Sequence, residues 1–347
     1  MAMQAFQLVE AQKPAQLREV PVPEPGPGQV LLKVGGAGAC HSDLHLMDAP
    51  PEAFPAALPF TLGHENAGWI EKLGPGVTGF APGDPVLVYG PWGCGTCPSC
   101  RVGMENYCET TGGLGGGLGG NDGGMAPYLL VPSTRFLIPL GKLDPRDAAP
   151  LTDAALTSYH AVKRSLHLLG AGSTAVVIGA GGLGQMAIQI LRALSSATTV
   201  VAVDTADDKL ATAKRMGADE TLLSGDEAVT RIKDITRGQG AQLVLDMVGI
   251  DQTLRIAAQV ARVRGDLTIV GLGGGSVPVN FFSPPHECSV ASPYWGFIGE
   301  LMEVVALAEA GKINMLVEHF PLERAGEAYQ LLREGKIPGR AVITPNG

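Results

Sequence analysis

The sequence is poor in aromatic and charged residues, which make up 5% and 17% of its 347 positions. Lys and Arg number 25 against 34 Asp and Glu, so the net charge is −9 and there is no basic stripe to attract nucleic acid or an anionic membrane. No stretch approaches the roughly 18 uninterrupted apolar residues that cross a bilayer, and the N-terminus lacks the features of a secretory signal. We therefore expect a cytoplasmic protein with a small-molecule partner, and neither nucleic-acid nor membrane binding.

The length and the 45% hydrophobic content allow a substantial core and favour two domains. In the first part of the chain, frequent Gly and Pro separate short β-branched runs such as 30–34 and 85–89, which predicts a β-rich module with many loops. From residue 173 the pattern changes to apolar runs that alternate with segments of helical spacing.

This alternation predicts a doubly wound parallel sheet, because strands and helices of these lengths form successive βαβ units. The expected strands are 174–179, 199–203, 220–223, 243–247 and 267–272, and the expected helices are 183–193, 207–216, 227–236 and 253–263. After about residue 296 the rhythm ends with helices 300–309 and 324–334 and a terminal strand 339–344.

Four of the six cysteines are clustered: Cys94, Cys97, Cys100 and Cys108. This spacing on a loop that contains Gly and Pro lets four thiolates converge on one ion, which predicts a closed, structural tetrathiolate zinc site. A pair of disulfides is the alternative, but it fits poorly with a reducing compartment and with short C-x-x-C spans. Cys288 is interpreted as a structural free thiol.

A glycine fingerprint, G-x-G-x-x-G, follows the first strand of the predicted parallel sheet, and an acidic residue ends the next strand. The first glycine permits a tight turn, the second lets backbone approach a pyrophosphate, and the third allows close packing of the helix. A carboxylate at the acidic position binds ribose hydroxyls and repels a 2′-phosphate, so NAD is favoured over NADP. A purely structural glycine turn beside an N-capping Asp is the alternative. The predicted cofactor contacts here are Gly179, Gly181, Gly182, Leu183, Gly184 and Asp204.

Two further motifs, Cys40-His41-Ser42-Asp43-Leu44-His45 and Gly63-His64-Glu65 followed by Gly68, resemble those of the zinc-dependent, medium-chain alcohol dehydrogenases. With the cysteine cluster, the fingerprint and the domain order, the resemblance covers essentially the whole chain. It is strongest to the bacterial NAD-dependent secondary-alcohol dehydrogenases, including the Tyr-Gly-Pro-Trp-Gly-Cys stretch at 89–94 and the segment 151–154. It implies a GroES-like catalytic domain (1–153 and 296–347, with the zinc lobe at about 90–110) and a Rossmann NAD-binding domain (154–295).

The resemblance also implies a second, catalytic zinc, and therefore two Zn²⁺ per chain. Cys40, His64 and Asp153 correspond to its ligands, and Asp153 stands where many members carry Cys. Glu65 resembles an acidic residue that approaches the metal in some members, and Asp43 resembles the carboxylate that orients the ligand imidazole. Taken singly, Cys40 is explained as a buried small residue, His64 as a turn residue and Asp153 as a helix N-cap.

The implied reaction is hydride transfer between a hydrophobic alcohol, secondary or aryl, and NAD(H). Ser42 matches the hydroxyl that contacts the substrate oxygen, and His45 matches the end of a proton relay, although a surface histidine explains His45 equally well. His41, Thr157, Val270 and Arg340 match further cofactor contacts. The alternatives are a polyol or aldehyde-specific dehydrogenase of the same family and, in another class, a non-enzymatic nucleotide-binding relative. A homo-oligomer is expected, with a tetramer favoured over a dimer.

The substrate pocket is predicted by family position alone, and ordinary core aromatics are the alternative. Apart from Asn121, which can hydrogen-bond a polar group of the substrate, its residues are bulky and apolar and suit hydrophobic alcohols better than sugars. Between residues 112 and 124 the chain is almost entirely glycine, which predicts a mobile surface loop, with a lid or pocket wall as the alternative. The predicted pocket residues are Phe54, Trp92, Leu118, Asn121, Tyr294 and Trp295, the last two from a neighbouring region or subunit.

Overall fold

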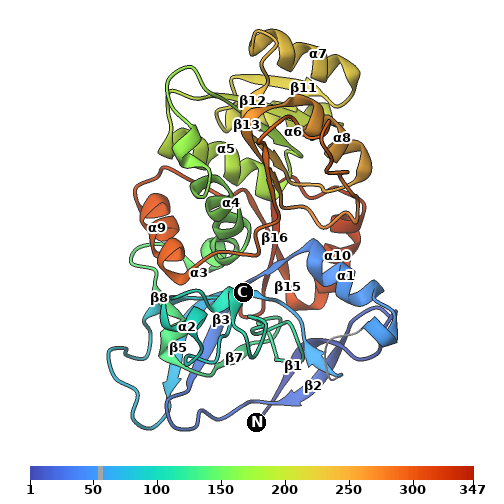
Figure 1. The fold of residues 1–347 in the computed structure, drawn as a ribbon. Helices are drawn as coiled ribbons and strands as arrows, with labels where there is room; N and C mark the ends of the chain where they lie inside the picture. The colour runs from blue at the N-terminus through green and yellow to red at the C-terminus, as the bar shows by residue number, and fades with distance from the viewer. Residues whose placement is uncertain (54–57) are drawn as a thin grey trace. The chain divides into compact units, whose positions relative to one another are not determined.

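A computed structural model describes residues 1–53 and 58–347 of the protein. The chain divides into two compact units, and each is described by itself. Unit 1 contains Met1–Asp153, Phe297–Glu309 and Met315–Gly347, and unit 2 contains Ala154–Gly296 and Ala310–Asn314. Both ends of the chain therefore contribute to unit 1, as the blue and red segments of Figure 1 show.

Unit 1 is built on a seven-stranded sheet in the order β15-β16-β3-β5-β6-β8, with β7 also paired to β3, and a three-stranded sheet in the order β2-β1-β4. Its strands are β1 (Ala2–Leu8), β2 (Gln16–Pro21), β3 (Val30–Ala39), β4 (Phe60–Thr61), β5 (Glu65–Leu73), β6 (Pro85–Val88), β7 (Tyr128–Val131), β8 (Leu137–Pro139), β15 (Val317–Pro321) and β16 (Arg340–Thr344). The predicted β-rich module is confirmed, and its runs at 30–34 and 85–89 form β3 and β6.

The register of three strands brings distant residues of unit 1 to one edge. β3 and β5 are antiparallel with Gly38 opposite Glu65, so the residue after β3 and the residue before β5 are neighbours. β16 pairs antiparallel with β3 on its other side, with Ala341 opposite Ala39. Cys40, His64 and Arg340 therefore meet although up to 300 positions separate them (340 − 40).

The helices of unit 1 are α1 (His41–Asp48), α2 (Pro98–Arg101), α3 (Pro145–Ala148), α9 (Ile298–Glu309) and α10 (Ala325–Arg333), with 3₁₀ turns η1 (Pro51–Ala53), η2 (Glu105–Tyr107), η3 (Thr134–Phe136), η4 (Ala149–Thr152) and η6 (Leu322–Arg324). Cys40 caps the N-terminus of α1, where its backbone N–H donates to the Asp43 carboxylate at 3.0 Å. This local bond satisfies one backbone donor at the helix start and fixes the position of the carboxylate.

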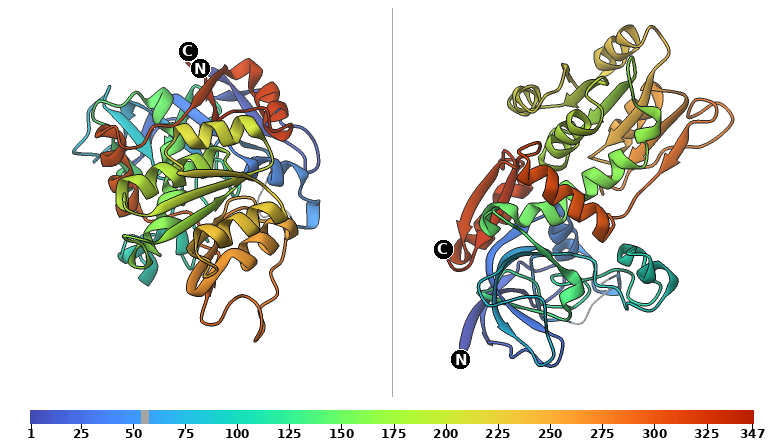
Figure 2. Two further views of the ribbon diagram at one scale, coloured as in Figure 1. Left: turned by 90° about the horizontal axis from the view of Figure 1, so that it is seen from above. Right: turned by 90° about the vertical axis from the view of Figure 1, so that its left-hand side faces the viewer.

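Unit 2 is a parallel six-stranded sheet in the order β11-β10-β9-β12-β13-β14, with helices on both faces (Figure 2). Its elements are α4 (Ala154–Lys163), η5 (Leu166–Leu168), β9 (Thr174–Ile178), α5 (Gly182–Leu194), β10 (Thr199–Asp204), α6 (Asp207–Arg215), β11 (Glu220–Leu223), α7 (Asp226–Ile235), β12 (Ala241–Asp246), α8 (Asp251–Val260), β13 (Ala261–Ile269) and β14 (Ser289–Ala291). The predicted doubly wound sheet is confirmed. The strand order reverses between β9 and β12, the switch point where such sheets bind ligands.

The largest difference from the predicted bounds is at the junction of α8 and β13. Helix 253–263 ends at Val260, and the next strand starts at Ala261, six residues before the expected 267. Ala261 pairs with Ala241 in the parallel sheet, so tertiary pairing overrides an apolar spacing that would continue the helix. The edge strands β14 and β15 were not predicted from the sequence. Among the described residues, no helix is long and apolar enough to cross a membrane.

Candidate metal centres and nucleotide site

The four clustered cysteines converge in unit 1. The sulfurs of Cys94, Cys97, Cys100 and Cys108 lie within 4.8 Å of one another, and all four are unpaired thiols, so the disulfide alternative is wrong. The Cys97 and Cys108 sulfurs are 4.0 Å apart, close to the roughly 3.8 Å between sulfurs that tetrahedral zinc–thiolate bonds require. The donor set therefore fits a closed, four-coordinate metal site.

Local backbone geometry shapes this cysteine lobe. Gly95 has a φ of +79°, and a Cβ at Gly93 would lie 2.5 Å from the Cys100 sulfur, so both positions require glycine. Backbone N–H groups of Cys97 and Thr111 point at the Cys94 and Cys108 sulfurs, both at 3.4 Å. Hydrogen bonds from the Thr96 hydroxyl and from backbone N–H groups lower the pKa of Cys94 to about 5. Its thiolate is thus available to a metal at neutral pH.

A second cluster contains one atom each from Cys40, His64, Glu65 and Asp153, again within 4.8 Å of one another. An Asp153 oxygen lies 3.5 Å from the Cys40 sulfur and 3.7 Å from His64 Nε2. Cys40, His64 and Glu65 are buried, and the Asp153 side chain is 14% exposed. One thiolate, one imidazole and one carboxylate are a suitable ligand set for zinc with an open fourth position.

Arg340 supplies positive charge to this cluster. Its buried guanidinium donates to both oxygens of Glu65, and at 3.1 Å to Asp153. Burial alone would raise the pKa of Asp153, but His64 and Arg340 hold the pKa of this carboxyl well below its usual range. Burial raises the pKa of Glu65 to about 7 despite the opposing Arg340 charge. Asp153 is therefore the carboxylate better suited to remain ionised as a metal ligand, and Glu65 is held by Arg340.

Asp43 orients the His64 ring. His64 Nδ1 lies 2.9 Å from Asp43 Oδ1, which assigns the proton to Nδ1 and leaves Nε2 as the metal-facing atom. The second Asp43 oxygen accepts from the Cys40 N–H and, at 2.7 Å, from the hydroxyl of Tyr329 on α10. Sequence reasoning missed Tyr329 because a tyrosine on the apolar face of an amphipathic helix gives no signal beyond core packing.

Three further predicted residues lie on α1 beside this cluster. The Ser42 hydroxyl is 3.3 Å from His64 Nε2, so it lies beside the proposed ligand set. His41 and His45 are exposed, which suits a proton exit at His45 and equally an ordinary surface residue. Their functional roles stay predictions.

The fingerprint of unit 2 has the predicted strand–turn–helix context. Gly179 has a φ of +92°, a Cβ at Gly184 would lie 1.9 Å from the Gly179 carbonyl oxygen, and nothing lies within 4 Å of a Cβ at Gly181. Gly181 therefore leaves room for a pyrophosphate at the N-terminus of α5, where Gly182 and Leu183 form the first turn. Asp204 accepts three backbone N–H bonds, from Ala180, Thr205 and Ala206.

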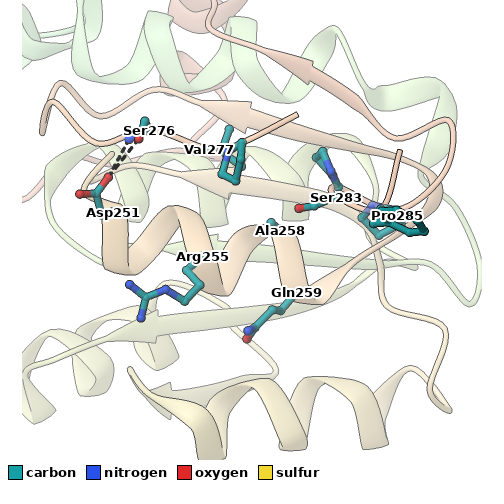
Figure 3. Close-up of a pocket in the computed structure, with 11 residues that line it drawn as sticks. Asp251, Arg255, Ala258, Gln259, Ser276, Val277, Ser283 and Pro285 are labelled. Atoms are coloured by element: carbon teal, nitrogen blue, oxygen red, sulfur yellow. Dashed lines mark hydrogen bonds between the residues drawn. The ribbon is translucent and has the colours of Figure 1, made fainter. Parts of the chain in front are cut away.

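Two of the other predicted cofactor contacts belong to unit 2. Thr157 is buried on α4, and Val270 is half-buried directly after β13. Arg340 belongs instead to unit 1, where its guanidinium contacts the second metal cluster. A pocket of about 570 Å³ lies between α8 and segment 276–285 (Figure 3), and within the described chain none of its lining residues is a predicted cofactor or substrate contact.

The predicted pocket residues have mixed surroundings. In unit 1, the Trp92 indole stacks on Phe136 and donates to a backbone carbonyl, Leu118 is buried, and the Asn121 amide donates to its own loop. In unit 2, Trp295 is buried and packs edge-on against the half-exposed ring of Tyr294. Phe54 lies outside the described residues. The substrate pocket stays a prediction.

The glycine segment 112–124 is not the surface loop that we expected, because Gly113, 115–118 and 123–124 are buried. A Cβ at Gly117 would lie 2.5 Å from Gly63, and Gly123 donates its N–H to the Thr61 carbonyl oxygen at 2.8 Å. At its other end, the Gly112 N–H donates to the carbonyl oxygen of Cys108. Glycine is needed here for close backbone approach, and the segment connects the cysteine lobe to the chain before His64.

Comparison with known proteins places both parts of the chain in alcohol dehydrogenase domain families. Residues 26–142 match the alcohol dehydrogenase GroES-like domain, and residues 182–310 match the zinc-binding dehydrogenase domain. The chain is 40% identical to an NAD-dependent alcohol dehydrogenase of Sulfurisphaera tokodaii, across 99% of this chain and 100% of that protein.

Two other relatives also match this chain over nearly its full length. The D-arabinose 1-dehydrogenase (NADP(+)) of Saccharolobus solfataricus is 36% identical, across 96% of this chain and 95% of that protein. The crystal structure of the alcohol dehydrogenase from Aeropyrum pernix is 35% identical with a TM-score of 0.91, covering 99% of this chain and 100% of that one. This agreement in sequence, length and fold means that the chain belongs to the zinc-dependent, medium-chain alcohol dehydrogenase family.

Proposed function

We propose that the protein interconverts a hydrophobic alcohol and its ketone or aldehyde with NAD(H). The observation that carries this proposal is the buried set of Cys40, His64 and Asp153, which fits a zinc ion with one open position. When bound, zinc lowers the pKa of the substrate hydroxyl and the nicotinamide ring accepts the hydride. We propose two zinc ions per chain, the second in the cysteine lobe.

The chain's own groups then have distinct tasks. Asp43 holds the His64 ring so that Nε2 faces the metal position. Ser42, 3.3 Å from that nitrogen, is placed to take the proton of the substrate hydroxyl while it gives up its own proton, and the exposed His45 on the same helix is the group that would release that proton to solvent. Arg340 holds Glu65, so Asp153 is the carboxylate left for the metal.

Asp204 sets the preference for NAD. Three backbone N–H groups fix its carboxylate at the end of β10, where it accepts hydrogen bonds from ribose hydroxyls and repels a 2′-phosphate. In Asp204→Asn the charge is lost and a hydrogen-bond acceptor remains. We expect the ratio of kcat/KM for NAD over NADP to fall by about tenfold, the effect of roughly 1.4 kcal/mol. An unchanged ratio would show that Asp204 does not discriminate between the ribose of NAD and that of NADP.

The substrate class is tested by following NADH consumption over aryl ketones, aliphatic ketones, aldehydes and sugars. The bulky, apolar residues at the predicted pocket positions favour the ketones. The similarity to a D-arabinose dehydrogenase supports a polyol as the second candidate, and a preference for oxidising sugars or polyols with NADP⁺ would select it. Metal analysis of the same sample should give two zinc ions per chain. Bound NAD without turnover of any substrate would support the non-enzymatic alternative.

We also propose that the protein works in the cytoplasm as a homo-oligomer, with a tetramer favoured. An apolar, exposed segment after β13 supports the formation of an oligomer. In this segment Val279, Phe281 and Phe282 are 70%, 75% and 88% exposed. The short strand β14 ends the sheet of unit 2 next to this segment in sequence and offers an edge for pairing. Light scattering of the intact protein measures the assembly, and Phe282→Ser should weaken it.

A further inference from the structure

Asp43 is a fully buried carboxylate that depends on three donors. His64 Nδ1 bonds to one of its oxygens, and the Cys40 N–H and the Tyr329 hydroxyl bond to the other. The first two donors lie close to Asp43 in the sheet-edge motifs, whereas Tyr329 comes from α10, 286 positions along the chain. A buried carboxylate is rigid only when its lone pairs are satisfied, so the third donor determines how firmly Asp43 is held.

Tyr329 itself is firmly placed. Its ring stacks on Phe6 with centroids 6.0 Å apart and planes at 14°, and its hydroxyl also lies 3.4 Å from the Met125 sulfur. Because a hydroxyl has one proton, the 2.7 Å bond to the carboxylate takes it in preference to the weak thioether acceptor. Burial and the nearby Asp43 charge raise the pKa of Tyr329 well above its usual value, so the hydroxyl remains a donor.

The same two helices are joined a second time at the surface. Arg333, one turn after Tyr329 on α10, donates to both carboxylate oxygens of Asp48 at the end of α1, at 2.7 and 2.9 Å. The two contacts fix α1, which carries Asp43, against α10 at two points. The placement of Asp43 therefore depends on the C-terminal helix as well as on its own loop.

We propose that Tyr329 is a positioning residue for the metal site at Cys40, His64 and Asp153, acting through Asp43 on the orientation of the His64 ring. This inference rests on the proposed function, because it requires a metal at that cluster. Tyr329 contacts neither the metal position nor a reacting atom, so its loss should weaken metal retention and leave the nucleotide site unchanged.

The test is Tyr329→Phe, which removes one oxygen and keeps the ring stacked on Phe6. Loss of such an outer hydrogen bond typically weakens metal binding by about 10- to 100-fold, so we expect the cluster to release metal that much faster to a chelator. The cobalt-substituted protein reports the ligand geometry directly, and we expect a shifted visible spectrum. The metal of the cysteine lobe is the internal control and should be released at the parent rate.

Two further variants separate positioning from a general loss of structure. Met125→Leu removes the other contact of the hydroxyl at nearly constant volume and should release metal like the parent protein. In an Asp43→Asn background, Tyr329→Phe should have little additional effect, because the double-mutant cycle isolates a pathway through Asp43. Equal release rates and cobalt spectra for Tyr329→Phe and the parent would overturn the inference, as would equally faster release from both metal sites. A parent protein that binds no metal at Cys40, His64 and Asp153 would instead refute the proposed function.

Discussion

The two metal clusters of unit 1 are built in opposite ways. All four proposed ligands of the cysteine lobe come from one short stretch, 94–108, and its geometry depends on the positive φ of Gly95 and on the absence of a side chain at Gly93. The ligands of the second cluster come from the ends of β3 and β5 and from the residue after η4, and Arg340 reaches them from β16. The proposed structural site is thus local, whereas the proposed open site depends on the topology of the whole unit.

The electrostatics of the two clusters differ for the same reason. In the lobe, hydrogen bonds from the same loop lower the pKa of Cys94 to about 5 and that of Cys108 to about 7, whereas burial raises the pKa of Cys100. The second cluster combines Cys40, His64 and two carboxylates with a buried guanidinium, so its charge balance depends on residues far apart in the chain. Removing a lobe ligand should therefore mainly cost stability, and removing a ligand of the second cluster should mainly cost turnover.

The largest expected effect is that of His64→Ala. Without the imidazole the metal position loses a ligand, and the several kcal/mol that a Lewis acid supplies correspond to a loss of roughly 1000-fold or more in kcat. NAD affinity, measured by fluorescence titration, should stay at the parent value because the fingerprint lies in unit 2. His319→Ala, which removes a surface partner of Asp147, is the control. Turnover within tenfold of the parent would mean that the cluster is not catalytic.

The next effect in size is that of Cys97→Ser in the lobe. Since a structural zinc site contributes folding energy, we expect the free energy of unfolding to fall by several kcal/mol and one metal ion per chain to be lost. Urea unfolding and metal analysis measure these two changes. If this variant keeps its stability and its metal content, the lobe is not a structural metal site.

A smaller effect should follow from Gly117→Ala in the glycine segment between the clusters. The residue has a φ of +83°, and its new Cβ would lie 2.5 Å from the backbone of Gly63, next to His64. Strain and overpacking together should cost about 2–4 kcal/mol of unfolding free energy. Gly76→Ala is a matched control, because its φ is +81° and nothing lies within 4 Å of the added atom. Equal losses in both variants would show that the segment tolerates a side chain.

Features that local contacts determine could be predicted from the sequence, and features that distant contacts determine could not. The cysteine lobe, the glycine turn after β9 and the strand–helix alternation of unit 2 are local patterns, and each was predicted close to its observed bounds except at the junction of α8 and β13 and at β14. No local pattern groups Cys40, His64 and Asp153. From the sequence, only the resemblance to a family predicted that these residues lie together. Tyr329 had no signal at all, because its contact with Asp43 depends on how α10 packs against α1.

The burial of the glycine segment was also beyond local reasoning. Without side chains, 112–124 has no periodicity that predicts a partner, and its high backbone freedom predicts mobility. In the structure, that same lack of side chains permits close approach to Gly63 and Trp92. The backbone freedom was identified correctly, but the predicted surface position was wrong, because contacts from other segments bury much of this stretch.

The smallest expected effect is that of Asp48→Asn at the outer contact between α1 and α10. Both partners are more than half exposed, at 53% for Arg333 and 57% for Asp48, so solvent screens the pair and its loss should cost about 0.2–1 kcal/mol at neutral pH. The hydrogen bond from Arg333 lowers the pKa of Asp48 below its usual 3.8, so the pair stabilises the folded state above that pH and the contribution is lost as the pH falls through the lowered pKa. Urea midpoints of the variant and the parent should therefore differ at pH 7 and converge once the pH has fallen below the lowered pKa of Asp48. If the difference persists in acid, the effect comes from packing of the side chain and not from its charge. If this variant loses metal from the second cluster, the exposed contact contributes to the position of α1 in addition to Tyr329.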